Sequence, residues 1–305
     1  MAAEGVSQLH TEQRNPNTLG IDRMTTAQIL RKINDEDQTV AGKVREALPQ
    51  VEKAVDLLTE RMRRGGRLVY VGAGTSGRLG FMDAAECAPT YGLPDAVACV
   101  MAGGRDAVFK AQESLEDDGA RAARDLNDWG LTERDVVVAA AASGRTPYCI
   151  GALDYARSIG AGTVSIACNP HSEMAAHAQI AIEVDTGCEV IMGSTRMKAG
   201  TAQKLVMNML STAVMIRLGR TCDNLMVCLH AKNEKLVNRV ARLYREATGE
   251  GDPLRVEEAL RAANGRLDVA ILMQKTGASF DEARSAMDEH GNFGQALLKL
   301  AGATC

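Results

Sequence analysis

Aromatic side chains are scarce in this chain: they make up 3% of its 305 residues and include one tryptophan. Proteins that bind single-stranded nucleic acid stack the bases on aromatic side chains, so this scarcity argues against such a surface. The chain also lacks an excess of positive charge, because its formal net charge is -4. We therefore expect no general attraction to a polyanion and no nucleic-acid partner.

Metal-ligand spacing and membrane-length apolar runs are also missing. The eight cysteines and five histidines are dispersed, and no two cysteines form a C-x-x-C pair. We interpret the cysteines as reduced core thiols rather than as metal ligands or disulfides. The first thirty residues carry no apolar signal core, and no apolar run is long enough to span a bilayer. The sequence thus predicts a soluble, cytoplasmic protein with no membrane partner.

Apolar runs of strand length alternate with helix-like segments in the middle of the chain. We expect strands at 67–71, 95–101, 135–140, 162–167 and 179–184, and helices at 76–85, 105–126 and 146–159. This alternation is typical of a parallel sheet covered by helices on both faces. The predicted fold is therefore a three-layer α/β/α domain with a five-stranded parallel sheet.

Helical patterns flank this domain on both sides, at 26–33, 40–63, 199–218 and 225–247. In the tail, Asp252 and Pro253 can start a helix that ends before Gly265. Ser279 can form a capping box with Glu282 for another helix, which Gly291 ends. We expect an N-terminal arm with helices at 1–50, a main domain with its long C-terminal helices at 51–247, and a small helical module at 252–305.

Three short loops rich in glycine and hydroxyl residues are the most informative motifs, at 72–78, 142–146 and 193–198. The first two follow predicted strands, and all three precede helix-like sequence. Strand ends converge in a parallel sheet, and helix N-termini with nearby hydroxyls bind phosphate groups. An ordinary turn with Ser or Thr as the N-cap explains any single loop about equally well. Three such loops, each beside an Arg or Lys, indicate a phosphorylated ligand.

The first loop also matches the dinucleotide pattern G-x-G-x-x-G at residues 72–77. A dinucleotide site further requires an acidic residue at the end of the second strand, where it binds the ribose. Here that strand runs into Ala102-Gly103-Gly104, and the carboxylate is missing. The sequence therefore argues against a dinucleotide cofactor.

Two acidic stretches follow the loops, at 83–89 and 113–118. We expect Pro89 to end the preceding helix just after Glu86, because proline disfavours helix at the residue before it. A carboxylate at such a break can be partly desolvated, as a general acid requires. Glu113 and Glu116 are spaced to share one face of the predicted helix. Solvated surface charge explains Glu113 well, and it leaves the role of Glu116 open.

The loops resemble those of sugar isomerase (SIS) domains, which bind phosphosugars. Longer segments resemble the N-acetylmuramic acid 6-phosphate etherase family, and the resemblance covers nearly the whole chain. These segments lie at 11–15, 33–37, 72–80, 83–92, 142–148, 193–205 and 233–236. The tail is also similar to a ubiquitin-associated (UBA) three-helix fold.

The resemblance implies a homodimeric carbon–oxygen lyase that needs no metal or other cofactor. Its substrate would be a phosphorylated amino sugar, from which it would release D-lactate by elimination followed by hydration, in the recycling of peptidoglycan sugars. The family pattern makes Glu86 the proton donor and Glu116 the second active-site glutamate, which we take as the base. It also predicts substrate or phosphate contacts at Thr75, Ser76, Gly77, Ser143, Gly144, Thr146, Ser194, Lys198, Asn233 and Lys235. A non-catalytic phosphosugar sensor and an aldose–ketose isomerase are the alternatives.

Overall fold

The computed structural model describes residues 8–110, 115–229 and 234–302. The chain divides into two compact units. The first comprises residues 1–85 and 95–211, and the second comprises residues 86–94 and 212–305. The domain boundaries expected from the sequence remain a prediction. In the described part of the chain, no helix is both long and apolar enough to cross a membrane.

The first unit is built on a parallel sheet of five strands in the order β2-β1-β3-β4-β5. The strands are β1 (Leu68–Gly72), β2 (Val97–Met101), β3 (Val136–Ala141), β4 (Gly162–Ala167) and β5 (Ile180–Glu183). Every residue of β1, β3 and β4 is buried, which explains why these strands are continuous apolar runs. All five expected strands are present within a few residues of their predicted bounds.

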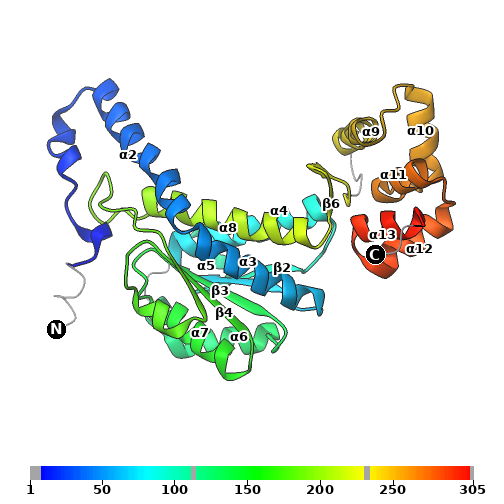
Figure 1. Cartoon of the computed structure of the whole chain (residues 1–305). Helices are drawn as coiled ribbons and strands as arrows, with labels where there is room; N and C mark the ends of the chain where they lie inside the picture. Colours follow the sequence, from blue (N-terminus) through cyan, green and yellow to red (C-terminus); the bar gives the residue numbers. More distant parts are fainter. Residues whose placement is uncertain (1–7, 111–114, 230–233, 303–305) are drawn as a thin grey trace. The chain divides into compact units, whose positions relative to one another are not determined.

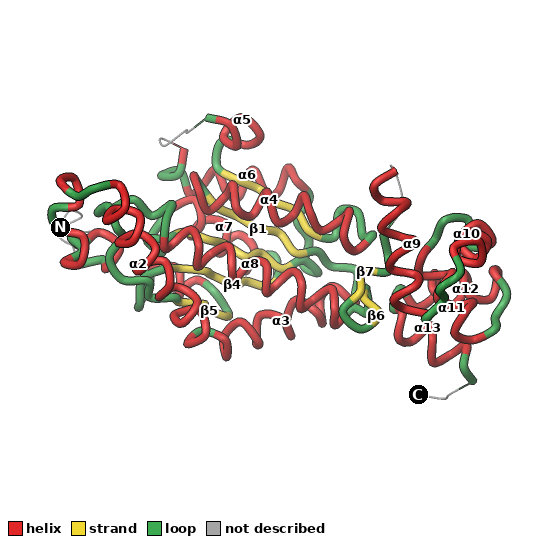
Figure 2. Tube along the Cα trace, turned by 90° about the horizontal axis from the view of Figure 1, so that it is seen from above, coloured by secondary structure: helices red, strands yellow, loops and turns green. Residues whose placement is uncertain are grey.

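Helices cover both faces of this sheet (Figure 1). On one face α6 (Gly119–Trp129) and α7 (Pro147–Ser158) pack against alternate strand residues such as Val69 and Val137. On the other face lie α3 (Leu48–Arg63), α4 (Gly74–Tyr91) and α8 (Lys198–Arg217). Seen from above, α3 runs along β4 and β5, with which it is in contact (Figure 2). The predicted three-layer α/β/α fold is therefore confirmed.

Several predicted helix bounds are wrong. Helix α2 (Thr26–Glu46) is continuous, and the break comes at Ala47 because Pro49 lies in the first turn of α3, where its missing N–H costs nothing. Helix α4 continues through Pro89 to Tyr91 instead of ending after Glu86. Next to Pro89, which has no N–H to donate, the Thr90 hydroxyl donates to the Glu86 carbonyl oxygen at 2.7 Å.

The single helix expected at 105–126 is also wrong. It is replaced by α5 (Gly104–Phe109) and α6, and residues 115–118 between them are not α-helical. Asp118 is the N-cap of α6, since its carboxylate accepts from the N–H of Arg121 at 2.9 Å. Glu116 therefore lies in a turn before a capped helix rather than on a helical face, and Glu113 lies outside the described residues.

The second unit contains a short antiparallel ribbon of β6 (Thr221–Cys222) and β7 (Leu225–Met226). The sequence predicted a long helix from residue 225, and that start is wrong because β7 occupies it. It continues with α9 (Glu234–Thr248), α10 (Pro253–Ala262), α11 (Leu267–Thr276), α12 (Phe280–His290) and α13 (Phe293–Leu300). Asp252 caps α10, and Ser279 and Glu282 form the predicted capping box of α12. Gly291 ends α12 in the left-handed conformation.

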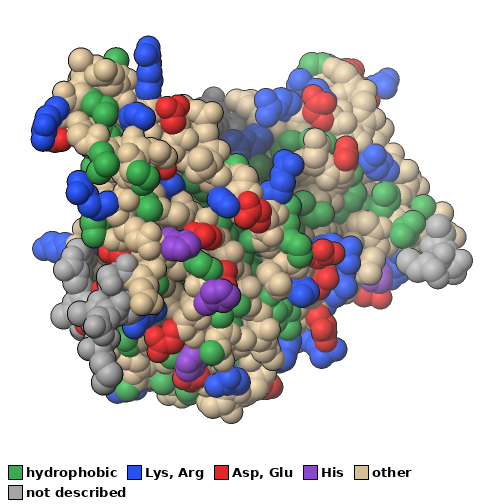
Figure 3. Space-filling view, turned by 60° about the vertical axis from the view of Figure 1, so that its left-hand side comes forward, with side chains coloured by type: hydrophobic (Ala, Val, Ile, Leu, Met, Phe, Trp, Pro, Cys, Tyr) green, Lys and Arg blue, Asp and Glu red, His purple; other side chains and the backbone are tan. Residues whose placement is uncertain are grey.

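Acidic and basic side chains are interspersed over the face of the molecule drawn in Figure 3. This mixed pattern agrees with the small net charge of -4.

Candidate active site

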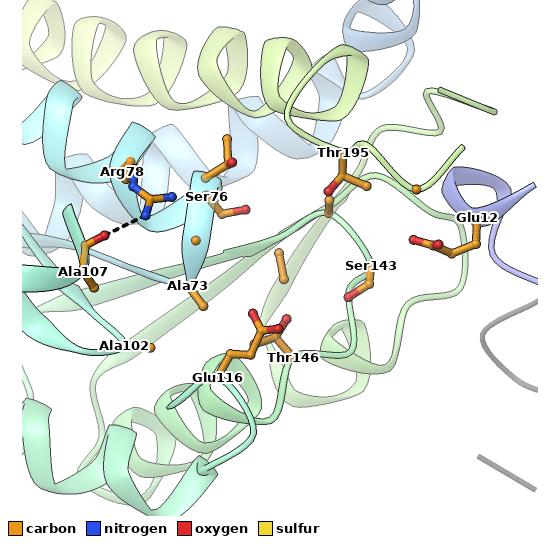
Figure 4. Close-up of a pocket in the computed structure, with 15 residues that line it drawn as sticks. Glu12, Ala73, Ser76, Arg78, Ala102, Ala107, Glu116, Ser143, Thr146 and Thr195 are labelled. Carbon is orange, nitrogen blue, oxygen red and sulfur yellow. Dashed lines mark hydrogen bonds between the residues drawn. The ribbon is translucent and has the colours of Figure 1, made fainter. Parts of the chain in front are cut away.

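A cavity of about 460 Å³ lies in the first unit, where β1 and β3 end. Its wall is formed by small residues, by serine and threonine side chains from the three loops, and by two glutamates (Figure 4). The lining residues are Glu12, Ala73, Gly74, Thr75, Ser76, Arg78, Ala102, Ala107, Glu116, Ala141, Ala142, Ser143, Thr146, Gly193 and Thr195.

The strand order explains why the cavity forms at this edge. Strands β1 and β3 are neighbours, and the helices that follow them, α4 and α7, cover opposite faces of the sheet. The chain therefore leaves the two strands in opposite directions and opens a crevice between the loops. Ligands of doubly wound α/β folds bind at such a switch point.

The loop after β1 lines the cavity with Thr75 and Ser76 at the start of α4. The buried Ser76 hydroxyl donates to Gln203 Oε1 at 2.8 Å, and Gln203 belongs to α8. Gly77 does not line the cavity: a Cβ on it would lie 2.9 Å from the Gly72 carbonyl oxygen. Gly77 is thus explained by the close packing of α4 on β1.

The loop after β3 adds the hydroxyls of Ser143 and Thr146. Thr146 is the N-cap residue of α7, but its side chain makes no capping hydrogen bond, and it faces the cavity (Figure 4). Gly144 has a φ of +70°, and a Cβ on it would lie 2.4 Å from Ser172 Cβ. Only glycine fits this tight turn without strain.

Glu116 is fixed against the same loop. The N–H of Tyr148, in the first turn of α7, donates to the Glu116 carbonyl oxygen at 3.0 Å. The half-buried Glu116 carboxyl group lies beside Thr146 and points into the cavity (Figure 4). The structure therefore brings together Thr75, Ser76, Ser143, Thr146 and Glu116, as the sequence predicted.

The third loop contributes Gly193 and Thr195, whereas Ser194 and Lys198 are not among the lining residues. The Lys198 ammonium lies 2.7 Å from Glu36 Oε2, and both side chains are buried. The backbone N–H groups of Lys198 and Ala199 donate to the Glu189 carboxylate at 2.9 and 3.0 Å. The start of α8 thus already binds an anionic group of the protein itself.

The pKa values of these two carboxyl groups shift in opposite directions. Burial raises the pKa of Glu189, and the hydrogen bonds from the start of α8 only partly offset it. Burial also opposes ionisation of Glu36, but hydrogen bonds from Lys198 and Asn17 outweigh it and lower its pKa.

Two of the arginines in the loops bind other parts of the protein. Arg78 lines the cavity, but its guanidinium donates to the carbonyl oxygens of Ala107 and Val108 at 2.8 and 2.9 Å (Figure 4). Arg145 Nε lies 3.7 Å from Glu173 Oε2, and Arg196 is exposed. The polar surface of the cavity therefore consists largely of hydroxyls, backbone groups and carboxylates.

The remaining predicted residues lie elsewhere. Glu86 is exposed on α4, about three helical turns beyond the lining residues at the start of that helix. Asn233 falls outside the described residues, and Lys235 lies on α9. The sequence did not predict the cavity positions of Glu12, Arg78 and Thr195, although these residues lie in the segments 11–15, 72–80 and 193–205 that resemble the family. Among the described residues no group of three His, Cys, Asp or Glu could hold a metal ion.

Comparisons with known proteins agree with this geometry. Residues 50–157 match the family described as the glucokinase regulatory protein N-terminal SIS domain, and residues 125–213 match the SIS domain family. The chain is similar to three proteins named N-acetylmuramic acid 6-phosphate etherase. That of Mycolicibacterium smegmatis is 52% identical over 94% of this chain and 96% of its own length. That of Brucella anthropi is 50% identical over 94% of both chains, and that of Clostridium beijerinckii is 47% identical over 98% of this chain and 99% of its own.

Proposed function

The chain belongs to the N-acetylmuramic acid 6-phosphate etherase family, and we propose a role for each polar side chain of its cavity in the etherase reaction. The enzyme serves the recycling of cell-wall amino sugars. Its substrate is N-acetylmuramic acid 6-phosphate, and its products are N-acetylglucosamine 6-phosphate and D-lactate. The observation that carries the proposal is the single cavity that holds Glu116 together with the hydroxyls of two strand-end loops.

The phosphate group binds at the starts of α4 and α7 in this proposal. Helix N-termini present N–H groups and a positive dipole to an anion, and hydroxyls add further donors. Thr75, Ser143 and Thr146 line this part of the cavity with hydroxyls. The Ser76 hydroxyl already donates to Gln203, so Ser76 would contribute the backbone N–H of the first turn of α4. Gly77 and Gly144 shape the two loops, and the start of α8 is unsuitable because Glu189 binds it. Contacts from Ser194, Asn233 and Lys235 remain predictions, whereas the buried ion pair with Glu36 argues against the contact predicted for Lys198.

The chemistry is an elimination followed by a hydration, which makes the enzyme a carbon–oxygen lyase. In the open-chain sugar the C2 proton is acidic because it is adjacent to the C1 aldehyde. A base removes this proton, the C3–oxygen bond breaks, and lactate leaves with the bonding electrons and a proton from a general acid. Water then adds across the unsaturated bond, its hydroxyl to C3 and a proton to C2. No electron is gained or lost overall.

Glu116 is our candidate for the base. Its backbone is fixed by Tyr148, and its half-buried carboxyl group faces the cavity beside Thr146. Such positioning is what a general base requires, and its loss costs typically 10²–10⁴-fold in rate.

Glu86 is our candidate for the acid, contributed by a second copy of the chain. In the described chain Glu86 is exposed, and Met82, one turn earlier on the same helix face, is 48% exposed. The neighbouring Phe81 is 39% exposed. Exposed apolar residues beside a functional carboxylate favour a homodimer in which α4 of one subunit faces the cavity of the other.

The first test is release of D-lactate from N-acetylmuramic acid 6-phosphate. Glu116→Gln should lower the rate by about 10²–10⁴-fold and slow exchange of the C2 proton with solvent deuterium. Asp117→Asn, which changes the adjacent exposed carboxylate, is the matched control and should retain activity. Sugar phosphate binding without turnover would favour a sensor, and aldose–ketose interconversion would favour an isomerase. Relatives over nearly the full chain favour the etherase.

The second test is subunit complementation. Glu86→Gln and Glu116→Gln should each be inactive alone, but mixed and refolded together they should recover about a quarter of wild-type activity, because half the dimers then contain one intact site. If both glutamates act within one subunit, every site in the mixture contains a mutation and no activity returns.

A further inference from the structure

The N-terminal arm, residues 8–23, holds Glu12 in the cavity wall. Thr11 is fully buried, and its N–H donates to Asn169 Oδ1 at 3.3 Å. Asn169 Nδ2 in turn donates to the Thr11 hydroxyl and to the carbonyl oxygen of Ala142, both at 3.0 Å. The Thr11 carbonyl oxygen accepts from the N–H of Gly193 at 3.3 Å. The residue next to Glu12 is thus fixed to both the second and the third loop.

The Glu12 carboxylate points into the cavity, toward Ser143 and Thr195 (Figure 4). A methyl group on Gly193 would lie 3.2 Å from Glu12 Oε2, so the glycine leaves room for the carboxylate. Within the described chain, no Lys, Arg or His side chain lies within ion-pair distance of Glu12. A carboxylate in such a site is an acceptor for hydrogen-bond donors that a ligand supplies.

The charge of Glu12 also limits which part of a ligand can approach it. A phosphate dianion would be repelled by the carboxylate, whereas the N-terminal ends of α4 and α7 attract it. The hydroxyl and amide groups of a sugar carry no charge and donate hydrogen bonds. The cavity therefore has donors for phosphate at the starts of α4 and α7 and an acceptor at Glu12, and Ser143 faces both.

We propose that Glu12 binds hydroxyl or amide donors of the sugar and so sets the direction in which the phosphosugar lies in the cavity. The inference rests on the proposed function for the identity of the ligand. Glu12 is a binding and specificity residue here, distinct from the acid and the base of the reaction.

The test measures binding by titration calorimetry, without turnover, for wild type, Glu12→Ala, Glu12→Gln, Ser143→Ala and Gln13→Ala. The ligands are N-acetylglucosamine 6-phosphate and inorganic phosphate, the latter also in competition with the sugar phosphate. Glu12→Ala should weaken binding of the sugar phosphate by about tenfold to a hundredfold, as expected for the loss of a hydrogen bond to a charged group. It should leave inorganic phosphate within about twofold, because that ligand binds at the other end.

The other variants separate the two ends of the cavity. Ser143→Ala should weaken both ligands, and Gln13→Ala, an exposed neighbour on the same arm, should weaken neither. Glu12→Gln keeps the shape and one acceptor and should fall between wild type and Glu12→Ala. Unchanged sugar phosphate binding in Glu12→Ala would overturn the proposal. An equal loss of affinity for both ligands in Glu12→Ala would also overturn it, because such a loss indicates a displaced arm. The proposal would likewise fail if inorganic phosphate did not compete with the sugar phosphate for the wild-type protein.

The outcome is separable from that of the proposed function. If wild type releases no D-lactate but the Glu12 variants lose the sugar phosphate selectively, the reaction is wrong and the binding role stands. If wild type releases D-lactate but the Glu12 variants show no selective loss of sugar phosphate binding, the proposed reaction stands and the binding role of Glu12 is wrong.

Discussion

Replacing Lys198 by methionine removes one partner of a buried ion pair. The Lys198 ammonium lies 2.7 Å from Glu36 Oε2, and the two side chains are 5% and 10% exposed. Methionine fills a similar volume without a charge. Glu36 would then keep a buried negative charge with neutral donors only, among them the Asn17 amide at 2.8 Å.

The expected cost follows from this geometry. Removing one partner of a buried pair destabilises a protein by about 3–5 kcal/mol. The Asn17 hydrogen bond remains, so we expect about 3 kcal/mol, the low end of that range. Phosphate binding by the folded protein should not change, because Lys198 is not among the residues that line the cavity.

The assay is urea unfolding followed by the fluorescence of Trp129, the single tryptophan, which lies on α6 of the α/β unit. The double variant Glu36→Gln with Lys198→Met removes both charges. Its loss of unfolding free energy should be smaller than the sum of the two single losses by about 1–3 kcal/mol, which is the coupling energy of the pair.

The pH dependence gives an independent check. In wild type the pKa of Glu36 is lowered, so its contribution to stability is present above its ordinary value of 4.5 and is lost as pH falls through the lowered value. Without Lys198, burial should instead raise the pKa of Glu36. The deficit of Lys198→Met should then be largest near neutral pH and shrink in acid, as Glu36 takes up a proton. Additive single effects, a deficit independent of pH or weakened phosphate binding would each refute the reasoning.

Three further predictions concern other buried contacts. Asp83 accepts hydrogen bonds from Tyr70, Asn208 and Ser211, and burial raises its pKa, so Asp83→Ala should cost about 3 kcal/mol in urea unfolding and Asp83→Asn less than about 1 kcal/mol. Gly144→Ala should raise KM for the phosphosugar and cost about 1–3 kcal/mol, because its Cβ would strike Ser172; an unchanged KM would contradict the role of this turn. Burial opposes ionisation of Asp135, but hydrogen bonds from Arg67 prevail and lower its pKa. Asp135→Asn should therefore be destabilised by about 2–3 kcal/mol above pH 4, and the deficit measured by thermal unfolding should shrink as pH falls further.

The sequence predicted the sheet well because its signals are local. Strands buried on both faces must be continuous apolar runs, and those of β1, β3 and β4 are unmistakable. Capping residues are equally local, and the predicted caps at Asp252 and Ser279 are confirmed. The Asp118-Gly119 start of α6 carried the same kind of signal, but the adjacent run of acidic residues concealed it.

The site was predictable only in part, because long-range contacts decide which side chains are available. Lys198 follows a hydroxyl loop and was a reasonable phosphate ligand, yet its partner Glu36 is 162 positions away in sequence. Glu12 lies far from the strand-end loops in sequence, and nothing in its neighbours indicates that Thr11 is buried against Asn169. Periodicity and spacing do not encode such pairings.

The attachment of the arm has a consequence for biosynthesis. Thr11 pairs with Asn169 across 158 positions, and also with Gly193. Closing so long a loop is entropically unfavourable until the intervening chain has folded. During synthesis on the ribosome, the N-terminal arm therefore cannot attach until nearly two thirds of the chain, up to Gly193, has been made. The side of the cavity that contains Glu12 is completed only after the sheet that supports it.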